Sequence, residues 1–273
     1  RLLASVATVR TCNPHLLPES SFTYNLCLFY SGDNLRATLD YWHFDIDNPI
    51  GTESYNQLVS AYQAGGATRE AIQSQIVCPP GFAEGECAVS QVERVQPLIV
   101  NGPSQTTNGI DFFVNYDLDL GVSTALGLEG SYTLSKEIDP YFKSGALIAT
   151  GVETAGYYNF DNSARPTPDL KLRAFANVGI TANSSFLAYV NHVGEMTDRR
   201  AATQSLPSGK AVDSFTTIDL HFNLALSDRL SFTASVVNAG DQDPPLAYSD
   251  LMYDAWNHSP VGRIIKGGFK YRF

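Results

Sequence analysis

The four cysteines are the residues in this sequence with the most distinctive possible chemistry. Cys78 and Cys87 bracket the short segment 79–86, which contains two prolines and two glycines. In an exported protein, a disulfide between them would close and stiffen this loop. Neither cysteine has a histidine or further cysteine nearby, so no metal site is expected. Cys12 and Cys27 are expected to be free thiols.

Aromatic side chains gather in long segments that are polar and rich in Gly, Pro and Asp. Such rings can stack on the faces of sugars or of ring-bearing ligands. The alternative is that they form an aromatic girdle and pack loop against loop. The candidate ligand contacts are Tyr55, Tyr62, Tyr141, Phe142, Tyr157, Tyr158, Phe160, Tyr248, Tyr253 and Trp256.

The remaining polar residues give no sign of catalysis. No Ser/His/Asp spacing, glycine-rich phosphate loop or paired-carboxylate motif is present, so neither an enzyme nor a cofactor is predicted. Solvated turn positions explain the aspartates better than calcium binding does: these are Asp45, Asp47, Asp241 and Asp243. The net charge of −10 disfavours nucleic acid, whose phosphates need clustered Lys and Arg.

The elements that carry these residues are strands with period-2 alternation. From Ser20 to Tyr30 one face carries aromatic and aliphatic side chains, while the other face is mixed. Similar runs are 35–42, 110–117, 126–134, 170–180, 218–224, 230–236 and 265–273; 186–193 is a further strand whose facing is unclear. No run approaches the roughly 20 apolar residues of a membrane helix. A soluble β-rich protein and a membrane β-barrel remain.

The connections between these strands favour the membrane barrel. The short ones are 31–34, 119–123, 182–184 and 227–229, and the long ones are 48–95, 137–165, 194–212 and 239–261. Short and long connections alternate, as in a barrel with short periplasmic turns and long extracellular loops. A short helix is predicted at Tyr55–Ala64 within the first long loop.

The C-terminal run sets the orientation of the strands. Phe269, Tyr271 and Phe273 alternate up to the last residue, as in the signature that the outer-membrane assembly machinery recognises. Phe273 is therefore placed at the periplasmic side, and every long loop falls outside. The count gives about nine strands if Gln96 to Leu118 is one long strand, kinked near Gly102-Pro103.

Several motifs, in order, resemble TonB-dependent outer-membrane receptors. Asn13-Pro14-His15-Leu16-Leu17-Pro18-Glu19 resembles the segment that leads into a late barrel strand. Further resemblances lie at 39–48, Asn108-Gly109-Ile110-Asp111, Asn238–Pro245 and Gly262-Arg263. The family commonly has Leu-Phe where this chain has Ala239-Gly240, so the side chains packed at this point differ from the family's. The resemblance covers nearly the whole chain.

The resemblance implies that residues 1–273 are the C-terminal part of one all-β, antiparallel transmembrane barrel of roughly 22 strands. A plug, about thirteen earlier strands and the TonB-contacting segment would lie upstream of Arg1. The strands here cannot close a barrel alone, so the fragment is expected to be inactive by itself. The implied partners are outer-membrane lipid, the TonB-ExbB-ExbD complex, the assembly machinery and a small nutrient ligand.

The leading functional hypothesis is energy-coupled uptake of a scarce nutrient across the bacterial outer membrane. An iron-siderophore, cobalamin or an oligosaccharide are the candidate ligands. A passive porin or adhesin barrel is the second hypothesis, and a soluble β-rich binding domain is the third.

Overall fold

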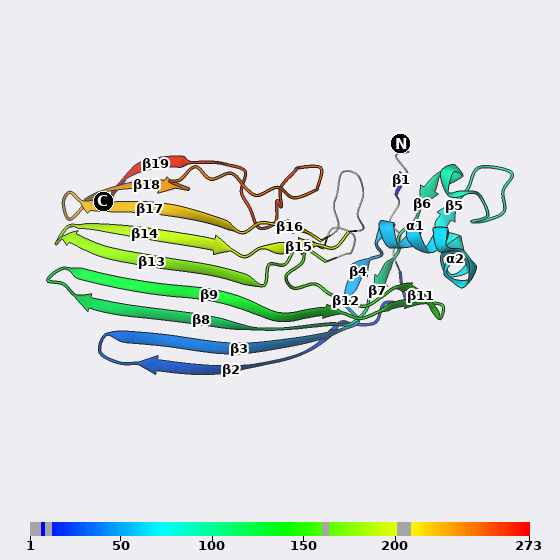
Figure 1. The fold of residues 1–273 in the computed structure, drawn as a ribbon, viewed down its shortest axis with the longest axis horizontal. Coiled ribbons are helices and arrows are strands. Elements are labelled where there is room, and N and C mark those ends of the chain that lie inside the picture. The colour runs from blue at the N-terminus through cyan, green and yellow to red at the C-terminus, as the bar shows by residue number, and fades with distance from the viewer. Residues whose placement is uncertain (1–6, 9–12, 160–163, 201–208) are drawn as a thin grey trace.

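One long antiparallel sheet dominates the computed structural model, which describes residues 7–8, 13–159, 164–200 and 209–273 (Figure 1). Its strands follow chain order, each paired with the next, and β12 (Val152–Glu153) adds to the end of β9. The strands are β2 (Ser20–Ser31), β3 (Leu35–Asp47), β8 (Gln105–Asp119), β9 (Ser123–Ile138), β13 (Leu170–Thr181), β14 (Ser184–Val193), β17 (Phe215–Ala225), β18 (Leu230–Val237) and β19 (Ile264–Tyr271). The nine predicted strands and their antiparallel order are confirmed.

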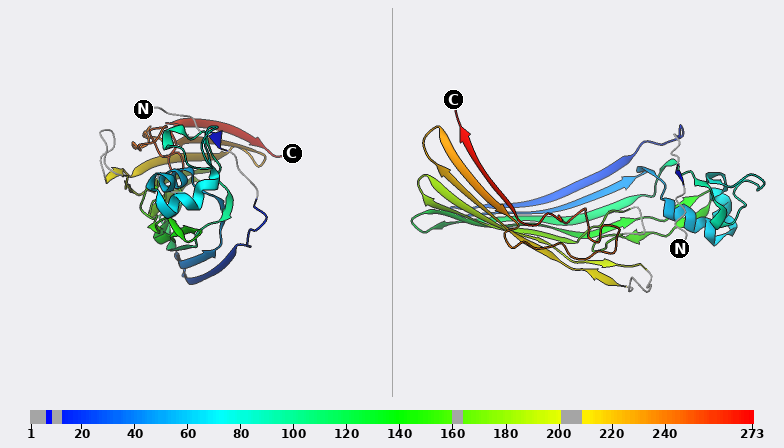
Figure 2. Two further views of the ribbon diagram at one scale, coloured as in Figure 1. Left: turned by 90° about the vertical axis from the view of Figure 1, so that its right-hand side faces the viewer. Right: turned by 90° about the horizontal axis from the view of Figure 1, so that it is seen from above.

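The sheet curves into an open arc whose edges are β2 and β19 (Figure 2). The short turns all lie at one end of the strands, together with the C-terminus, and the long connections all lie at the other end (Figure 1). The predicted alternation of short and long connections is therefore confirmed.

The register separates an apolar face from a polar one. Leu28, Leu39 and Phe112 are directly opposite one another on neighbouring strands, so they share a face. Side chains on this face are exposed: Leu26 and Phe269 each keep 72% of their surface. An apolar surface of this extent is what lipid contact requires, and no sealed core covers it.

The opposite face carries polar and charged side chains. Arg173 pairs with Glu129 across β13 and β9 at 3.3 Å, and Arg36 pairs with Asp117 across β3 and β8 at 3.1 Å. The register also settles the facing of β14: Val190 lies opposite Ile218 on the apolar face, whereas its neighbour Tyr189 lies on the polar face.

The prediction of one long strand from Gln96 to Leu118 is wrong. The strand β8 begins only at Gln105, and the preceding β7 (Ile99–Asn101) pairs with β4 (Ile50–Thr52) outside the main sheet. Pro103 lacks the N–H that a ladder needs. The adjacent Gly102 N–H instead donates to Pro49 O at 2.7 Å, so the chain leaves the sheet where a kink was expected.

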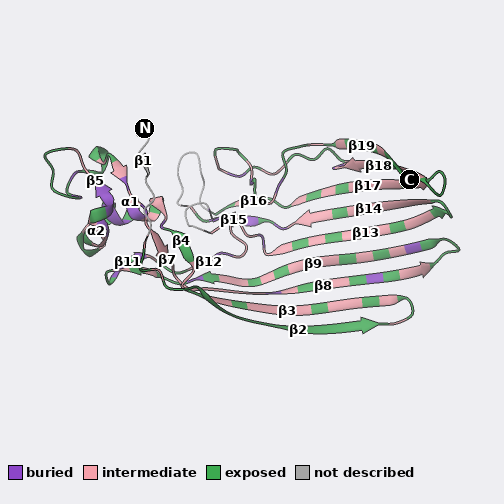
Figure 3. Ribbon diagram, turned by 180° about the vertical axis from the view of Figure 1, so that it is seen from behind, coloured by how far each residue is buried: buried purple, intermediate pink, exposed green. Residues whose placement is uncertain are grey.

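Apart from Ile138 at the end of β9, the buried apolar side chains of the described residues lie in the long loops rather than in the main sheet (Figure 3). The first loop forms α1 (Tyr55–Ala64), as predicted, and α2 (Gly66–Ile72). Ser54 caps α1 by accepting a hydrogen bond from Gln57 N. Neither helix is long and apolar enough to span a membrane.

The short elements of the loop region complete this layer. They are β1 (Ala7–Thr8), η1 (Gln73–Gln75), β5 (Ile76–Val77), η2 (Val89–Gln91), β6 (Arg94–Val95), β10 (Tyr141–Lys143), β11 (Ala146–Ala149), β15 (Met196–Asp198) and β16 (Lys210–Val212). Leu58, Ile72 and Val95 are completely buried and pack with Ala146 and Ile148, so the first two long loops share one core. A second core joins Tyr158 from the second long loop with Met196, Val212 and Ala247 from the third and fourth.

Gly127 makes room for an aromatic ring on the polar face. It lies opposite Phe175, and a Cβ at Gly127 would lie 2.1 Å from Phe175 Cζ. Tyr189 and Phe113 flank that ring at 6.3 and 6.4 Å, which limits its freedom to move. We therefore expect Gly127→Ala to lower the free energy of unfolding in lipid vesicles by about 1–3 kcal/mol.

Gly267→Ala is the matched control for this prediction. Its added Cβ would meet nothing closer than Thr233 O at 3.9 Å. If both variants lose the same free energy of unfolding, the close approach of Phe175 to Gly127 does not explain the loss.

Candidate functional site

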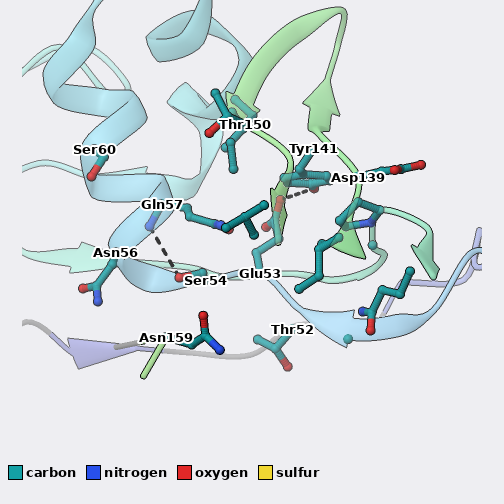
Figure 4. Close-up of a pocket in the computed structure, with 18 of the residues that line it drawn as sticks. Thr52, Glu53, Ser54, Asn56, Gln57, Ser60, Asp139, Tyr141, Thr150 and Asn159 are labelled. Atoms are coloured by element: carbon teal, nitrogen blue, oxygen red, sulfur yellow. Dashed lines mark hydrogen bonds between the residues drawn. The ribbon is translucent and has the colours of Figure 1, made fainter. Parts of the chain in front are cut away.

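A cavity of about 1410 Å³ lies among the long loops at one end of the sheet. The segment before and within α1, the break between β7 and β8, and the β10–β11 hairpin all contribute to its wall (Figure 4). The end of the second long loop adds Arg165, and the third long loop adds Arg199 and Arg200. The cavity is therefore assembled from segments far apart in the sequence, and 15 of its 26 lining residues have polar side chains.

Glu53 connects two of these loops. Its carboxylate accepts hydrogen bonds from Lys143 Nζ at 2.6 Å, Tyr141 Oη at 2.9 Å and Leu98 N at 2.9 Å. Gln75 Nε2 also donates to it. The side chain of Glu53 is only 1% exposed. A buried carboxylate with this many donors fixes the β10–β11 hairpin against the helical loop.

The environment of Glu53 shifts two pKa values. Burial alone would raise the pKa of Glu53, but the hydrogen bond and charge of Lys143 and the Leu98 N–H hold it below its usual range. Burial, and then the charge of Glu53 beside the phenol, raise the pKa of Tyr141. At neutral pH Glu53 is therefore ionised and the Tyr141 hydroxyl is protonated, as the hydrogen bond from Tyr141 to Glu53 requires.

Cys78 and Cys87 form a disulfide at the outer tip of the first loop, with Cα atoms 5.7 Å apart. Tyr62 Oη donates toward Gly85 O at 2.9 Å and Cys87 O at 2.5 Å. The Arg69 guanidinium lies over the Tyr62 ring at 4.2 Å and also donates to Gly85 O at 3.0 Å. The disulfide-closed segment is thus attached to both helices. Cys27 has no disulfide partner in the described chain, and Cys12 lies outside the described residues.

The ten candidate aromatic residues differ in what they can offer a ligand. Tyr62 and Tyr158 are buried at 2% and 5% exposure, so they support the loop cores rather than a surface. Phe142 and Trp256 are well exposed, and Phe160 lies outside the described residues. Tyr141 lines the cavity. The half-buried remainder are Tyr55, Tyr157, Tyr248 and Tyr253.

The polar residues that organise the cavity were not identified from the sequence. Glu53 and Lys143 lie 90 positions apart, and no spacing motif connects them. The described residues contain no group of three or more His, Cys, Asp or Glu side chains placed to hold a metal ion. Phe269, Tyr271 and Phe273 are exposed at the short-turn end of the sheet, where the C-terminus lies. The ring centroids of Tyr271 and Phe273 are 5.2 Å apart.

The fold and this loop layer define an outer-membrane β-barrel segment with a polar site at its long-loop end. The family model for the TonB-dependent receptor-like β-barrel matches residues 3–239, so the chain belongs to the TonB-dependent receptors. These receptors are bacterial outer-membrane transport proteins and not enzymes, which confirms the class and location predicted above. A search of curated proteins gave no match.

Solved structures of this class share the fold. The ferric enterobactin receptor PfeA from Pseudomonas aeruginosa is 18% identical with a TM-score of 0.59, covering 93% of this chain and 31% of its own. The siderophore receptor PirA from Acinetobacter baumannii is 16% identical with a TM-score of 0.59, covering 94% and 32%. The outer membrane transporter YddB from Escherichia coli is 12% identical with a TM-score of 0.61, covering 98% and 34%. The chain thus spans about a third of these proteins.

Proposed function

We propose that this chain is the C-terminal part of the barrel of a TonB-dependent active transporter for a scarce nutrient. An iron-siderophore, cobalamin or an oligosaccharide is the candidate cargo. The extracellular loops bind the nutrient, and a plug outside this chain is rearranged by the TonB-ExbB-ExbD complex. The outer-membrane assembly machinery recognises the alternating aromatic residues Phe269, Tyr271 and Phe273.

The observation that carries this proposal is the polar cavity in the long-loop layer of a barrel that belongs to this family. Its volume of about 1410 Å³ exceeds the 300–1,000 Å³ usual for sites that hold drug-sized ligands. Loops with their own buried cores can keep such a site open, because their walls do not depend on a ligand for packing.

Uptake in a deletion strain tests the proposal. Cells that lack the complete gene should fail to accumulate one labelled cargo among a ferric siderophore, cobalamin and an oligosaccharide, and a plasmid copy should restore uptake. The restored uptake should vanish when TonB is also deleted. Uptake that persists without TonB would instead show a passive porin, and unchanged uptake of all three cargoes would refute the transporter.

A further inference from the structure

Three chain segments lie side by side next to the cavity, and two of them carry an arginine that lines it. Tyr157 forms bridges with Thr167 on one side and Thr197 on the other. The next residues follow the same arrangement: Asn159 Nδ2 donates to Arg165 O at 3.1 Å, and an Arg199 Nη donates to Asn159 Oδ1 at 3.4 Å. The backbone carbonyl of Arg165 and the side chain of Arg199 thus contact one asparagine, and all three residues line the cavity.

Aromatic rings, rather than carboxylates, support both guanidinium groups. Arg165 lies over the ring of Trp256 at 4.2 Å, and Arg199 lies over Tyr157 at 3.5 Å. Arg199 also donates to the backbone carbonyl of Glu153 at 2.7 Å. In the described residues no carboxylate oxygen lies within 4.0 Å of either guanidinium. Stacking fixes the plane of a guanidinium and leaves its edge donors for a ligand.

Most nearby carboxylates already have partners of their own. Glu53 pairs with Lys143, and Asp198 pairs with Arg200. The Glu153 carboxylate accepts from neutral donors, Ser135 Oγ at 2.6 Å among them. Asp139 is the exposed acid of the cavity lining, and it has no ion pair in the described chain. The two stacked arginines therefore keep their charge for a ligand.

We propose that Arg165 and Arg199 form an anion clamp that binds oxyanion groups of the transported nutrient. The proposal rests on the transport function above and narrows its cargo. The cargo carries carboxylate, phosphate or catecholate oxygens, so a neutral oligosaccharide is excluded. Two pre-positioned guanidiniums give charge-assisted, bidentate hydrogen bonds to such groups, and little side-chain freedom is lost on binding.

Calorimetry on the complete receptor in detergent tests the clamp with citrate and pyrophosphate as anionic probes and maltohexaose as the neutral one. We expect an anion to bind and maltohexaose not to bind. Arg165→Gln and Arg199→Gln should each weaken anion binding by roughly 10- to 100-fold, the loss expected for one charge-assisted hydrogen bond. Arg165→Lys and Arg199→Lys should recover part of this loss, because charge returns without the planar fork.

Lys210→Gln is the matched control, because it removes one exposed positive charge from a strand that does not line the cavity. Its anion affinity should equal that of the unaltered protein. Binding of maltohexaose but neither anion, or equal anion affinity in both glutamine variants and the unaltered protein, would overturn the clamp. Cargo uptake distinguishes the two proposals: TonB-dependent uptake that both glutamine variants retain would refute the clamp and leave the transport function standing.

Discussion

Glu53→Ala should loosen the shared core of the first two long loops by about 3–5 kcal/mol, the cost of removing one partner of a buried ion pair. Lys143 would keep a charge that is 81% buried, and the Tyr141 hydroxyl and Leu98 N–H would lose their acceptor. Hydrogen exchange on the complete receptor measures the effect. Protection should fall in α1 and in the β10–β11 hairpin, while the sheet strands keep theirs.

The double variant Glu53→Leu with Lys143→Met is the control for this result. Removing both charges leaves no unpaired ion, so most of the protection should return. If the single variant exchanges at the original rate, the ion pair does not hold the hairpin.

The same ion pair predicts an acid sensitivity. Because the folded pKa of Glu53 lies below its ordinary value of 4.5, the contact contributes fully above that value. Its contribution falls as the pH drops below 4.5 and through the folded pKa. Hydrogen exchange in the hairpin should therefore rise in acid. In Glu53→Gln this part of the pH dependence should be absent; an identical pH profile would assign the acid effect to other groups.

Leu220→Arg should lower the free energy of barrel folding into lipid vesicles by about 2–4 kcal/mol, the usual cost of an arginine facing lipid at the membrane centre. Leu220 lies in the middle of β17 and opposite Ala188 and Val236, so its side chain is on the apolar face. A gel mobility shift between folded and heat-denatured receptor gives the folded fraction during a urea titration.

His221→Arg tests the neighbouring side chain on the other face of the same strand. His221 contacts Ser235 Oγ at 2.9 Å and the edge of Tyr189, both on the polar face. An arginine there keeps access to water, so the folding midpoint should change much less than in Leu220→Arg. A larger loss for His221→Arg would reverse the assignment of the two faces.

The sheet could be predicted from the sequence because successive side chains of a strand point to opposite faces, so apolar alternation shows which residues face lipid. In β2 and β17, alternate residues share a face whatever their neighbours are, so the pattern alone locates lipid and water. The pattern failed between Gln96 and Ser104, where apolar residues pair with β4 instead of extending β8. Alternation cannot show which partner a short strand will choose.

The loop layer could be predicted only in outline. The capped helix at Tyr55–Ala64 and the cysteine spacing are local signals, and both were visible in the sequence. The contact of Glu53 with Lys143, and the placement of Arg165 and Arg199 in the wall of one cavity, depend on how the long loops fold against each other. Tyr62 shows the same limit. As an aromatic residue in a polar loop it was a candidate ligand contact, but in the structure its side chain is buried in the core of the first loop.

The strand order has a consequence for how the chain assembles. Four of the eight neighbouring strand pairs in the sheet are joined by a turn of a few residues, and four by a long connection; the longest, residues 48–104, separates β3 from β8. Closing that segment costs roughly 3 kcal/mol more entropy than closing a tight turn. We therefore expect the hairpins β2–β3 and β8–β9 to form as separate units, and their joining to be slower than the formation of either hairpin.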